Sequence, residues 1–258
     1  MPVAHDGVVL QLQSLSKSYR GSPALTDVTL DLCERTILGV VGRSGTGKTT
    51  LLKIVCGLIV PSSGRVVYRG TPLTKPTPDI AMVFQDYGRS LLPWRSVLEN
   101  VCLPLEARCP SFADVRARAR DHIRMVGLGA VENRYPHELS GGMQQRVAVA
   151  RALAQDAKIV LMDEPFSSLD TVTKFELEDT LLTVAKETCL TLMIVSHDLD
   201  DALFLSDEVL VLGRRTPSIV GRYVIPIRRP REQIATRSMP EFSAMRRTLS
   251  QDLFAGSV

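Results

Sequence analysis

The sequence predicts an α/β fold, and three observations support this prediction. Short apolar runs rich in valine and isoleucine recur along the chain between turn residues, which is typical of buried parallel strands. Helical stretches separate several of these runs, and alternating strands and helices are typical of an α/β sheet. A glycine-rich stretch, Gly42 to Thr49, joins one apolar run directly to a helical stretch.

The predicted elements follow in chain order. Strands are expected at Val8–Leu12, Ile37–Val41, Ile80–Phe84, Ile159–Met162, Leu192–Val195 and Val209–Leu212. Helices are expected at Thr49–Leu58, Met143–Ala154 and Lys174–Lys186. The stretch from about Gly88 to Glu138 contains arginines and alanines typical of helix and no convincing strand, so it is predicted to be a mainly helical insert. The arginines that follow Arg228 predict a solvated helical tail.

Length and composition bound the classes of protein to which the chain can belong. With 258 residues, 45% hydrophobic and 23% charged, the chain is expected to form one main globular domain around one core. The formal net charge of +3 is too small to predict the basic surface of a nucleic-acid-binding protein, and no nucleic acid is expected as a partner.

The cysteines and the N-terminal residues indicate the cellular compartment in which the protein is expected. The five cysteines are scattered without a C-x-x-C pair or a histidine spacing typical of metal sites, so they are predicted to be reduced core residues of a cytosolic protein. Residues Met1 to Leu10 lack the pattern of a secretory signal. No segment approaches the roughly 18 apolar residues of a membrane-spanning helix. Any role at a membrane is therefore expected to depend on a partner.

The glycine-rich stretch fits the pattern G-x-x-x-x-G-K-S/T between a predicted strand and a predicted helix. In such loops, backbone N–H groups surround phosphate oxygens and the helix directs its positive end at the anion. The sequence therefore predicts binding of ATP with Mg²⁺, with Lys48 on the β- and γ-phosphates and the Thr49 hydroxyl on the metal. The alternative is a glycine-rich turn with a chance lysine. The predicted nucleotide-binding residues are Gly42, Arg43, Ser44, Gly45, Thr46, Gly47, Lys48, Thr49 and Thr50.

Two carboxylates end the apolar run that starts at Ile159. Asp163 and Glu164 would lie at the carboxyl edge of the sheet, where α/β proteins bind ligands. Because bare charge at a buried strand end is unfavourable, a cation is expected there. Asp163 is predicted to hold Mg²⁺, and Glu164 to orient and deprotonate the attacking water. The alternative for Asp163 is an ordinary helix N-cap.

Two further strand ends carry polar side chains that are predicted to reach the same edge. His197 follows the run from Leu192 and is a candidate to hydrogen-bond the γ-phosphate. Gln85 follows the run from Ile80 and is a candidate to reach both Mg²⁺ and the attacking water. Taken alone, each would be an unremarkable loop residue. The predicted catalytic residues are Glu164, His197 and Gln85, and the predicted Mg²⁺ ligands are Thr49, Gln85 and Asp163.

A second glycine-rich turn, Leu139 to Arg146, leads into a predicted helix without a lysine. One nucleotide scarcely needs two such loops on one chain. This surplus and the sequence L-S-G-G-x-Q-Q-R resemble the signature of the ABC (ATP-binding cassette) ATPases, and the resemblance extends in motif order from about Val8 to Val224. It includes an adenine-stacking aromatic at Tyr19 and a D-loop at Ser167 to Asp170.

The resemblance implies a fold and a dimer. The fold is a P-loop (RecA-like) nucleotide-binding core with a small antiparallel β part and an inserted helical subdomain. One ABC ATPase domain would span residues 1–258, with a core at 1–87 and 155–225, a helical subdomain with the signature at 88–154, and a tail at 226–258. Each ATP would lie between two copies of the chain. The residues implied to contact the ATP of the other copy are Ser140, Gly141, Gly142, Gln144 and Asp170.

Within the family, the sequence around Trp94 resembles that of importer ATPases for nitrate, sulfonate and taurine, as do Arg134 to Glu138 and Asp201 to Asp207. This implies a peripheral protein on the cytoplasmic face of the cell membrane that works with permease subunits and, indirectly, with a periplasmic or extracytoplasmic solute-binding protein. Trp94 would then lie where a permease helix docks, or it is a core aromatic.

Several alternatives to import of such anions remain open. The chain could import a different class of solute, or it could be an ABC-type ATPase that acts on nucleic acid or ribosomes, although it lacks the long coiled-coil insertion or second cassette typical of those proteins. Presence of Lys48, Glu164 and His197 disfavours a silent nucleotide-binding regulator. A small-molecule kinase would leave the second glycine-rich turn unexplained.

Overall fold

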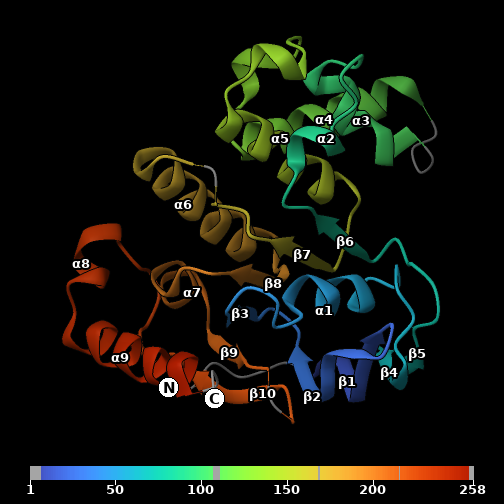
Figure 1. Ribbon diagram of the computed structural model, residues 1–258. Helices are drawn as coiled ribbons and strands as arrows, with labels where there is room; N and C mark the ends of the chain where they lie inside the picture. The colour runs from blue at the N-terminus through green and yellow to red at the C-terminus, as the bar shows by residue number, and fades with distance from the viewer. Residues whose placement is uncertain (1–6, 107–110, 168, 215, 256–258) are drawn as a thin grey trace. The chain divides into compact units, whose positions relative to one another are not determined.

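The computed structural model describes residues 7–106, 111–167, 169–214 and 216–255. Its contacts divide the chain into two compact units. The first unit combines Met1–Thr77 with Cys189–Val258, and the second is Pro78–Thr188. Figure 1 labels the elements of both units.

An antiparallel sheet forms one layer of the first unit. Its strands lie in the order β2-β1-β4-β5, with bounds Ser22–Cys33, Val8–Tyr19, Ser63–Tyr68 and Thr71–Pro72. Strand β2 alternates buried residues such as Val28, Leu30 and Leu32 with exposed ones, as expected of a strand with one face on the core. The predicted strand from Val8 therefore exists, but it is antiparallel, so its assignment to buried parallel strands was wrong.

Parallel strands form the centre of the other layer of the first unit. Strands β9 (Glu208–Leu212), β3 (Ile37–Gly42) and β8 (Thr191–Ser196) are adjacent and parallel, and β10 (Ile219–Val224) pairs antiparallel with β9. Every residue of β3, β8 and β9 is buried, which explains why these sequences are continuous apolar runs. The predicted parallel strands from Ile37, Leu192 and Val209 are confirmed.

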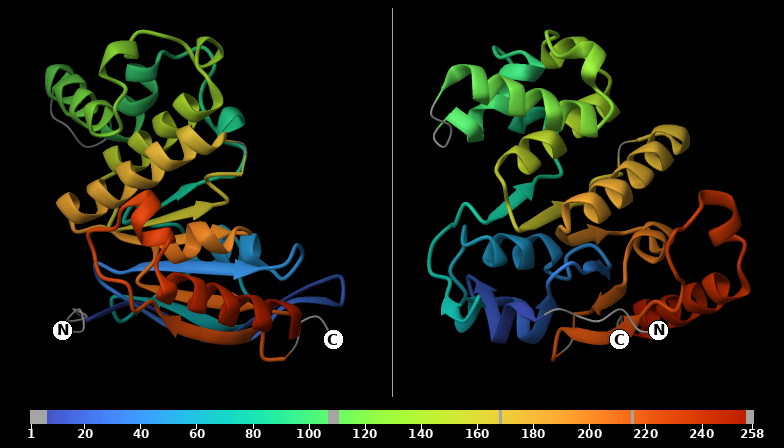
Figure 2. Two further views of the ribbon diagram at one scale, coloured as in Figure 1. Left: turned by 90° about the vertical axis from the view of Figure 1, so that its left-hand side faces the viewer. Right: turned by 180° about the vertical axis from the view of Figure 1, so that it is seen from behind.

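Helices α1 (Lys48–Val55), α7 (Leu199–Leu205), α8 (Gln233–Arg237) and α9 (Pro240–Ala255) complete the first unit. Helix α7 packs on β3 and β8, and α9 packs on α7 and β9. Figure 2 shows α8 and α9 in red beside α7 from two further sides. The tail is helical, as predicted, but Phe242 and Leu249 of α9 are 0% exposed. The expectation of a solvated tail was therefore wrong, because one face of α9 belongs to the core.

In the second unit, the parallel strands β6 (Ile80–Val83) and β7 (Ile159–Asp163) pair from Ile80 with Ile159 to Val83 with Met162. The helical elements of this unit are α2 (Tyr87–Ser90), α3 (Val97–Glu106), α4 (Phe112–Met125), η1 (Gly129–Val131), η2 (Pro136–Glu138), α5 (Gly141–Ala154) and α6 (Thr171–Thr188). Among the described residues between Gly88 and Glu138 the structure assigns helices and no strand, in agreement with the predicted helical insert.

The cysteines differ from the prediction in part. Cys56 and Cys102 are buried, and burial raises the pKa of both thiols. Cys33 is half-buried and Cys189 is exposed, so the expectation that all are core residues was wrong for these two. The fifth, Cys109, lies outside the described residues.

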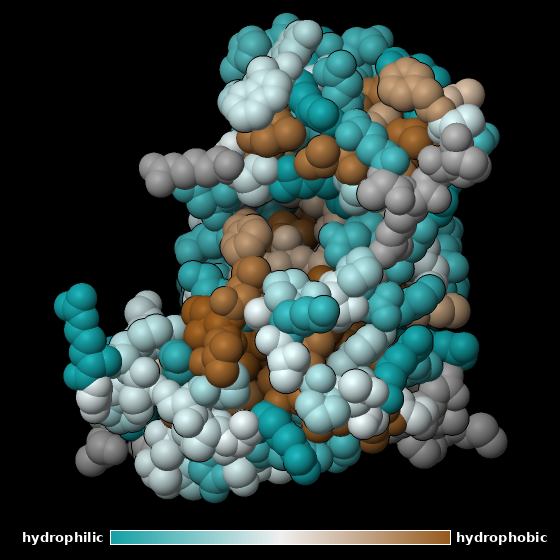
Figure 3. All heavy atoms as spheres, turned by 90° about the vertical axis from the view of Figure 1, so that its right-hand side faces the viewer, coloured by the Kyte–Doolittle hydropathy of each residue, from teal (hydrophilic) through white to brown (hydrophobic). Residues whose placement is uncertain are grey.

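Some hydrophobic side chains reach the surface. Figure 3 shows one face on which hydrophobic atoms gather in places within a mainly hydrophilic surface. The most exposed large hydrophobic side chains include Ile234 at 82%, Phe254 at 74% and Trp94 at 71%. Within the described ranges, none of the helices has both the length and the apolar character needed to cross a membrane.

Candidate functional site

The loop after β3 has the backbone conformation that its glycines predict. Gly47 lies at φ 88°, where residues with a side chain are strained, and a Cβ there would lie 2.3 Å from the carbonyl oxygen of Ala24. Lys48 is 7% exposed, and its Nζ donates to the carbonyl oxygens of Gly42 (2.6 Å) and Arg43 (3.1 Å). The lysine is thus held across the mouth of the loop by the loop's own carbonyls.

The loop fits a phosphate group. Helix α1 begins at Lys48 without a side-chain cap on its first N–H groups, and its first turn carries no acidic residue. Backbone N–H groups of an uncapped helix start favour an anion, and the adjacent lysine adds a full positive charge. Thr49 and Ser44 are exposed beside this helix start, whereas Thr46 is 3% exposed and donates its hydroxyl to the Arg43 carbonyl.

His197 lies beside this loop. Strand β8 runs parallel to β3 with Val41 opposite Ser196, so His197 follows at the same carboxyl edge at which the loop begins. Its side chain is exposed. Tyr19, 45% exposed, ends β1 and pairs with Ser22 of β2. Ala24, near the same end of the β1–β2 hairpin, contacts Gly47. The hairpin end that carries Tyr19 therefore borders the glycine-rich loop.

A second group of predicted residues meets in the second unit. Val83 pairs with Met162, so Gln85 and Glu164 both follow parallel neighbouring strands at one edge. The Gln85 Nε2 donates to the Glu164 Oε2 over 3.2 Å. Asp163, the last residue of β7, is 4% exposed. Glu164 has φ 48°, a left-handed conformation that seven other described non-glycine residues of the chain also adopt.

The second glycine-rich turn opens α5. Ser140 is the N-cap of this helix, and its Oγ accepts from the N–H of Met143 over 3.3 Å. The Gln144 amide donates to the carbonyl oxygens of Pro136 (2.9 Å) and Leu139 (3.3 Å), which fixes the turn onto the helix. Ser140 and Gly141 are exposed and the first turn of α5 carries no acid, so this helix start also fits an anion.

A threonine that sequence reasoning missed joins this turn to the D-loop. A Cβ at Gly142 would lie 2.2 Å from the Thr173 Cγ2, so this glycine allows α5 to approach α6 closely. The Thr173 hydroxyl donates to the Asp170 Oδ2 over 2.6 Å, and the backbone N–H groups of Val172 and Thr173 donate to the Oδ1. These hydrogen bonds, led by the one from the Thr173 hydroxyl, lower the pKa of Asp170. Of the D-loop residues, Ser168 lies outside the described part of the chain.

The predicted site residues thus form three groups. Lys48 with its loop, Tyr19 and His197 belong to the first unit, whereas Gln85, Asp163 and Glu164 lie together in the second. The residues of the signature and Asp170 form the third group, at the starts of α5 and α6. The predicted magnesium ligands are a threonine hydroxyl, an amide and a carboxylate, and these oxygen donors fit the preference of Mg²⁺.

The loop that carries Trp94 is held by a buried asparagine that sequence reasoning missed. Asn100 is 0% exposed, and its amide nitrogen donates to the carbonyl oxygens of Leu92, Arg95 and Ser96. Its Oδ1 accepts from the Leu92 N–H over 2.9 Å. Trp94, between these anchored residues, is 71% exposed, so the alternative that it is a core aromatic was wrong.

We expect Asn100→Ala to lower the free energy of unfolding by about 2–3 kcal/mol, because it removes the side-chain partner of the part-buried Leu92 N–H and Arg95 carbonyl. Chemical denaturation measures the change. Asn133→Ala, at an exposed position of the same unit, is the control and is expected to alter stability little. Equal stability of the Asn100 variant and the parent would show that water replaces the amide at no cost.

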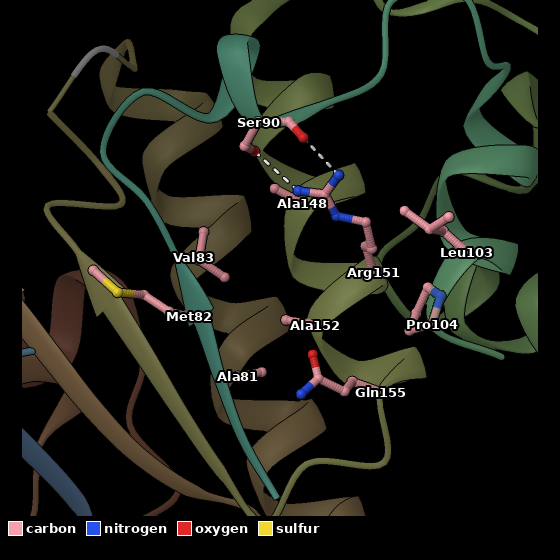
Figure 4. Close-up of a pocket in the computed structure, with 10 residues that line it drawn as sticks. All are labelled: Ala81, Met82, Val83, Ser90, Leu103, Pro104, Ala148, Arg151, Ala152 and Gln155. Carbon is pink, nitrogen blue, oxygen red and sulfur yellow. Dashed lines mark hydrogen bonds between the residues drawn. The ribbon is translucent and has the colours of Figure 1, made fainter. Parts of the chain in front are cut away.

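A hollow of about 240 Å³ lies near this loop within the second unit. Figure 4 shows that it lies between β6, α3 and α5, with the Arg151 guanidinium pointing to Ser90. Arg151 donates to the Ser90 carbonyl oxygen over 2.7 Å and to its Oγ over 3.0 Å, and burial lowers the pKa of Arg151. Leu103 and Pro104 supply an apolar side to the hollow.

Comparisons with known proteins agree on one family. The model of the ABC transporter family matches residues 25–167. The nitrate import ATP-binding protein NrtD of Synechococcus elongatus is 40% identical over 86% of this chain and 82% of its own length. The taurine import ATP-binding protein TauB of Yersinia pestis is 36% identical over 95% of this chain and 97% of its own. Among solved structures, a dimeric post-hydrolysis ATP-binding cassette bound to ADP and phosphate is 30% identical, with a TM-score of 0.75 over 85% of this chain and all of that one.

Proposed function

The chain belongs to the ABC transporter family, and from this membership we propose that it is the ATP-hydrolysing subunit of an importer that powers uptake of a small solute through a membrane permease. Relatives named as nitrate and taurine import ATP-binding proteins support an anion of that type as the solute. The chain would act at the cytoplasmic face of the cell membrane as one ABC ATPase domain.

The main support for the ATPase proposal is that β3 and β8 end at the same edge of the sheet. The lysine-bearing loop after β3 and His197 after β8 lie at the same carboxyl edge of the sheet. The loop leads into the start of α1, which fits an anion. Lys48 and the backbone of the loop bind the terminal phosphates of ATP, Tyr19 stacks on the adenine, and His197 donates a hydrogen bond to the γ-phosphate.

The second group of residues supplies the chemistry. Thr49, Gln85 and Asp163 would hold Mg²⁺, which would supply positive charge to offset that of the phosphates. Glu164 orients the attacking water and takes up its proton, and its hydrogen bond from Gln85 holds the carboxylate in place.

The signature turn acts on the other copy's nucleotide. In this proposal, the γ-phosphate is held by the Lys48 loop of one copy and by the Ser140 turn of a second copy, with Asp170 beside it. The exposed, acid-free start of α5 supports anion binding there, and the dimeric relative supports the two-copy arrangement. Hydrolysis removes the ligand that both copies share, which couples ATP turnover to separation of the halves.

The exposed Trp94 loop is proposed to receive a helix of the permease. Its rigid anchoring by Asn100 and the exposure of a large aromatic ring are typical of the centre of a protein interface. A solute-binding protein outside the membrane would deliver the cargo to that permease, without contact to this chain.

We expect the chain to co-purify with a multi-spanning membrane protein, and Trp94→Ala to weaken this association at least about tenfold, as for an interface anchor. Phe112→Ala, at a 68% exposed aromatic of the same unit, is the matched control and should retain the partner. Association with ribosomes or DNA, and not with a membrane protein, would contradict import and favour the non-transport alternative.

A further inference from the structure

Helix α7 begins two residues after His197, and the C-terminal segment (residues 226–255) holds both of its ends. At the start of the helix, the Ser196 Oγ accepts from the Asp198 N–H over 3.0 Å, and the Asp198 carboxylate accepts from the Asp200 N–H over 2.8 Å. His197 therefore lies between two residues that the start of α7 fixes.

An arginine of α9 reaches this start. Arg246 donates from Nε to the Asp200 Oδ1 over 2.6 Å and from Nη2 to the Oδ2 over 2.7 Å. Such a bidentate pair fixes both distance and orientation. The Arg246 guanidinium also lies 5.4 Å from the ring centroid of Phe242, a residue that is 0% exposed. Arg246 therefore packs against a buried core residue as well as bonding to α7.

A second arginine holds the far end of α7. Arg231 is 7% exposed, and its Nη1 donates to the carbonyl oxygens of Leu203 (3.2 Å), Phe204 (2.7 Å) and Ser206 (2.9 Å). The last carbonyls of a helix lack partners within it and favour a cation. Burial, with a smaller contribution from Arg229, lowers the pKa of Arg231 to about 10, so the group is still charged near neutral pH.

We propose that Arg246, through Asp200, is a positioning residue for His197, with Arg231 fixing the opposite end of α7. This inference rests on the proposed ATPase function, in which His197 contacts the γ-phosphate. Through these two arginines, the C-terminal segment sets where the histidine lies at the edge shared with the Lys48 loop.

Steady-state ATP hydrolysis is the first test. We expect Arg246→Ala to lower kcat about tenfold while the KM for ATP stays within about twofold, since a displaced group that acts on the γ-phosphate affects the transition state more than binding. Arg246→Lys should recover part of the loss. Arg247→Ala, at the exposed neighbouring position, should behave as the parent. In a His197→Ala background, Arg246→Ala should cause no further loss, whereas an additive loss would overturn the inference.

Side-chain NMR of the nucleotide-free chain tests the positioning without any hydrolysis. The chain has four histidines, and the spectrum of His197→Ala identifies the signals of His197. We expect both Arg246→Ala and Asp200→Asn to shift the His197 imidazole signals and to leave those of His122 and His137 unchanged. Unchanged His197 signals in Asp200→Asn, which keeps the shape of the side chain, would overturn the inference even if Arg246→Ala folds poorly.

The two measurements separate the inference from the function on which it rests. If the parent chain does not hydrolyse ATP, the proposed function fails while the NMR result still decides whether the C-terminal segment positions His197. If the parent hydrolyses ATP and His197→Ala lowers its rate, but Arg246→Ala keeps the full kcat, the function stands and the inference fails.

Discussion

Replacing Glu164 by glutamine is expected to slow ATP hydrolysis by roughly 10²–10⁴-fold, the contribution typical of a general base. The amide has the shape of the carboxylate but cannot take up the proton of the attacking water. ATP affinity should stay within about twofold of the parent, because binding depends on the Lys48 loop. Phosphate release at saturating ATP and a nucleotide titration measure the two effects, and ATP should now trap a dimer.

The control for this variant is Glu187→Gln, an exposed glutamate in α6 of the same unit. It removes the same charge from the second unit without touching the edge at which β6 and β7 end. Its hydrolysis rate should equal that of the parent. A Glu164 variant that hydrolyses ATP at the normal rate would remove Glu164 from the role of base.

Substitution of Lys48 by alanine is expected to lower ATP affinity by about a hundredfold or more, the loss typical when one member of a buried charge pair is removed. Lys48 is 7% exposed and its ammonium group already lies against the loop carbonyls of Gly42 and Arg43, so it is placed to receive the terminal phosphates without a large movement. A titration with ATP and Mg²⁺ measures the change.

Lys53→Ala, in the last turn of the same helix, is the matched control. It removes an equal charge from α1 but leaves the loop intact, so its ATP affinity should match that of the parent. Thermal unfolding of both variants separates loss of the site from loss of the fold. Full ATP affinity in a folded Lys48 variant would contradict the assignment of the loop.

The parallel strands could be predicted from the sequence because β3, β8 and β9 are buried on both faces and therefore appear as continuous apolar runs. The polar residues that follow these runs could be predicted to share an edge for the same reason. The half-buried strands were harder to recognise. In β2, Val28, Leu30 and Leu32 alternate with polar residues, which is the pattern of a strand with one buried face. Strand β4 begins with three exposed residues, so its pattern is weak.

In the C-terminal tail, the arginine-rich composition led to a wrong prediction of solvent exposure. Its arginines were expected to be solvated, but Arg231 is buried. It donates to the Ile227 carbonyl nearby and to three carbonyls at the end of α7, some twenty-five residues earlier in the chain. The sequence around Arg231 does not predict hydrogen-bond partners that lie so far away in the chain. The spacing of Phe242 and Leu249, seven residues apart on one helix, was a usable signal that one face of α9 is buried.

The family could be predicted from motifs, and the match to the ABC transporter model confirms it. The roles of the individual site residues stay predictions. Thr173 and Asn100 could not be found from the motifs, because each acts through contacts with residues that only the fold brings near.

A crystal structure of Glu164→Gln with ATP and Mg²⁺ would show directly whether two copies share each nucleotide. We predict that each γ-phosphate lies within hydrogen-bond reach of Lys48 from one copy and of Ser140 from the other. A structure in which the Ser140 turn lies far from phosphate in every copy would rule out this shared arrangement.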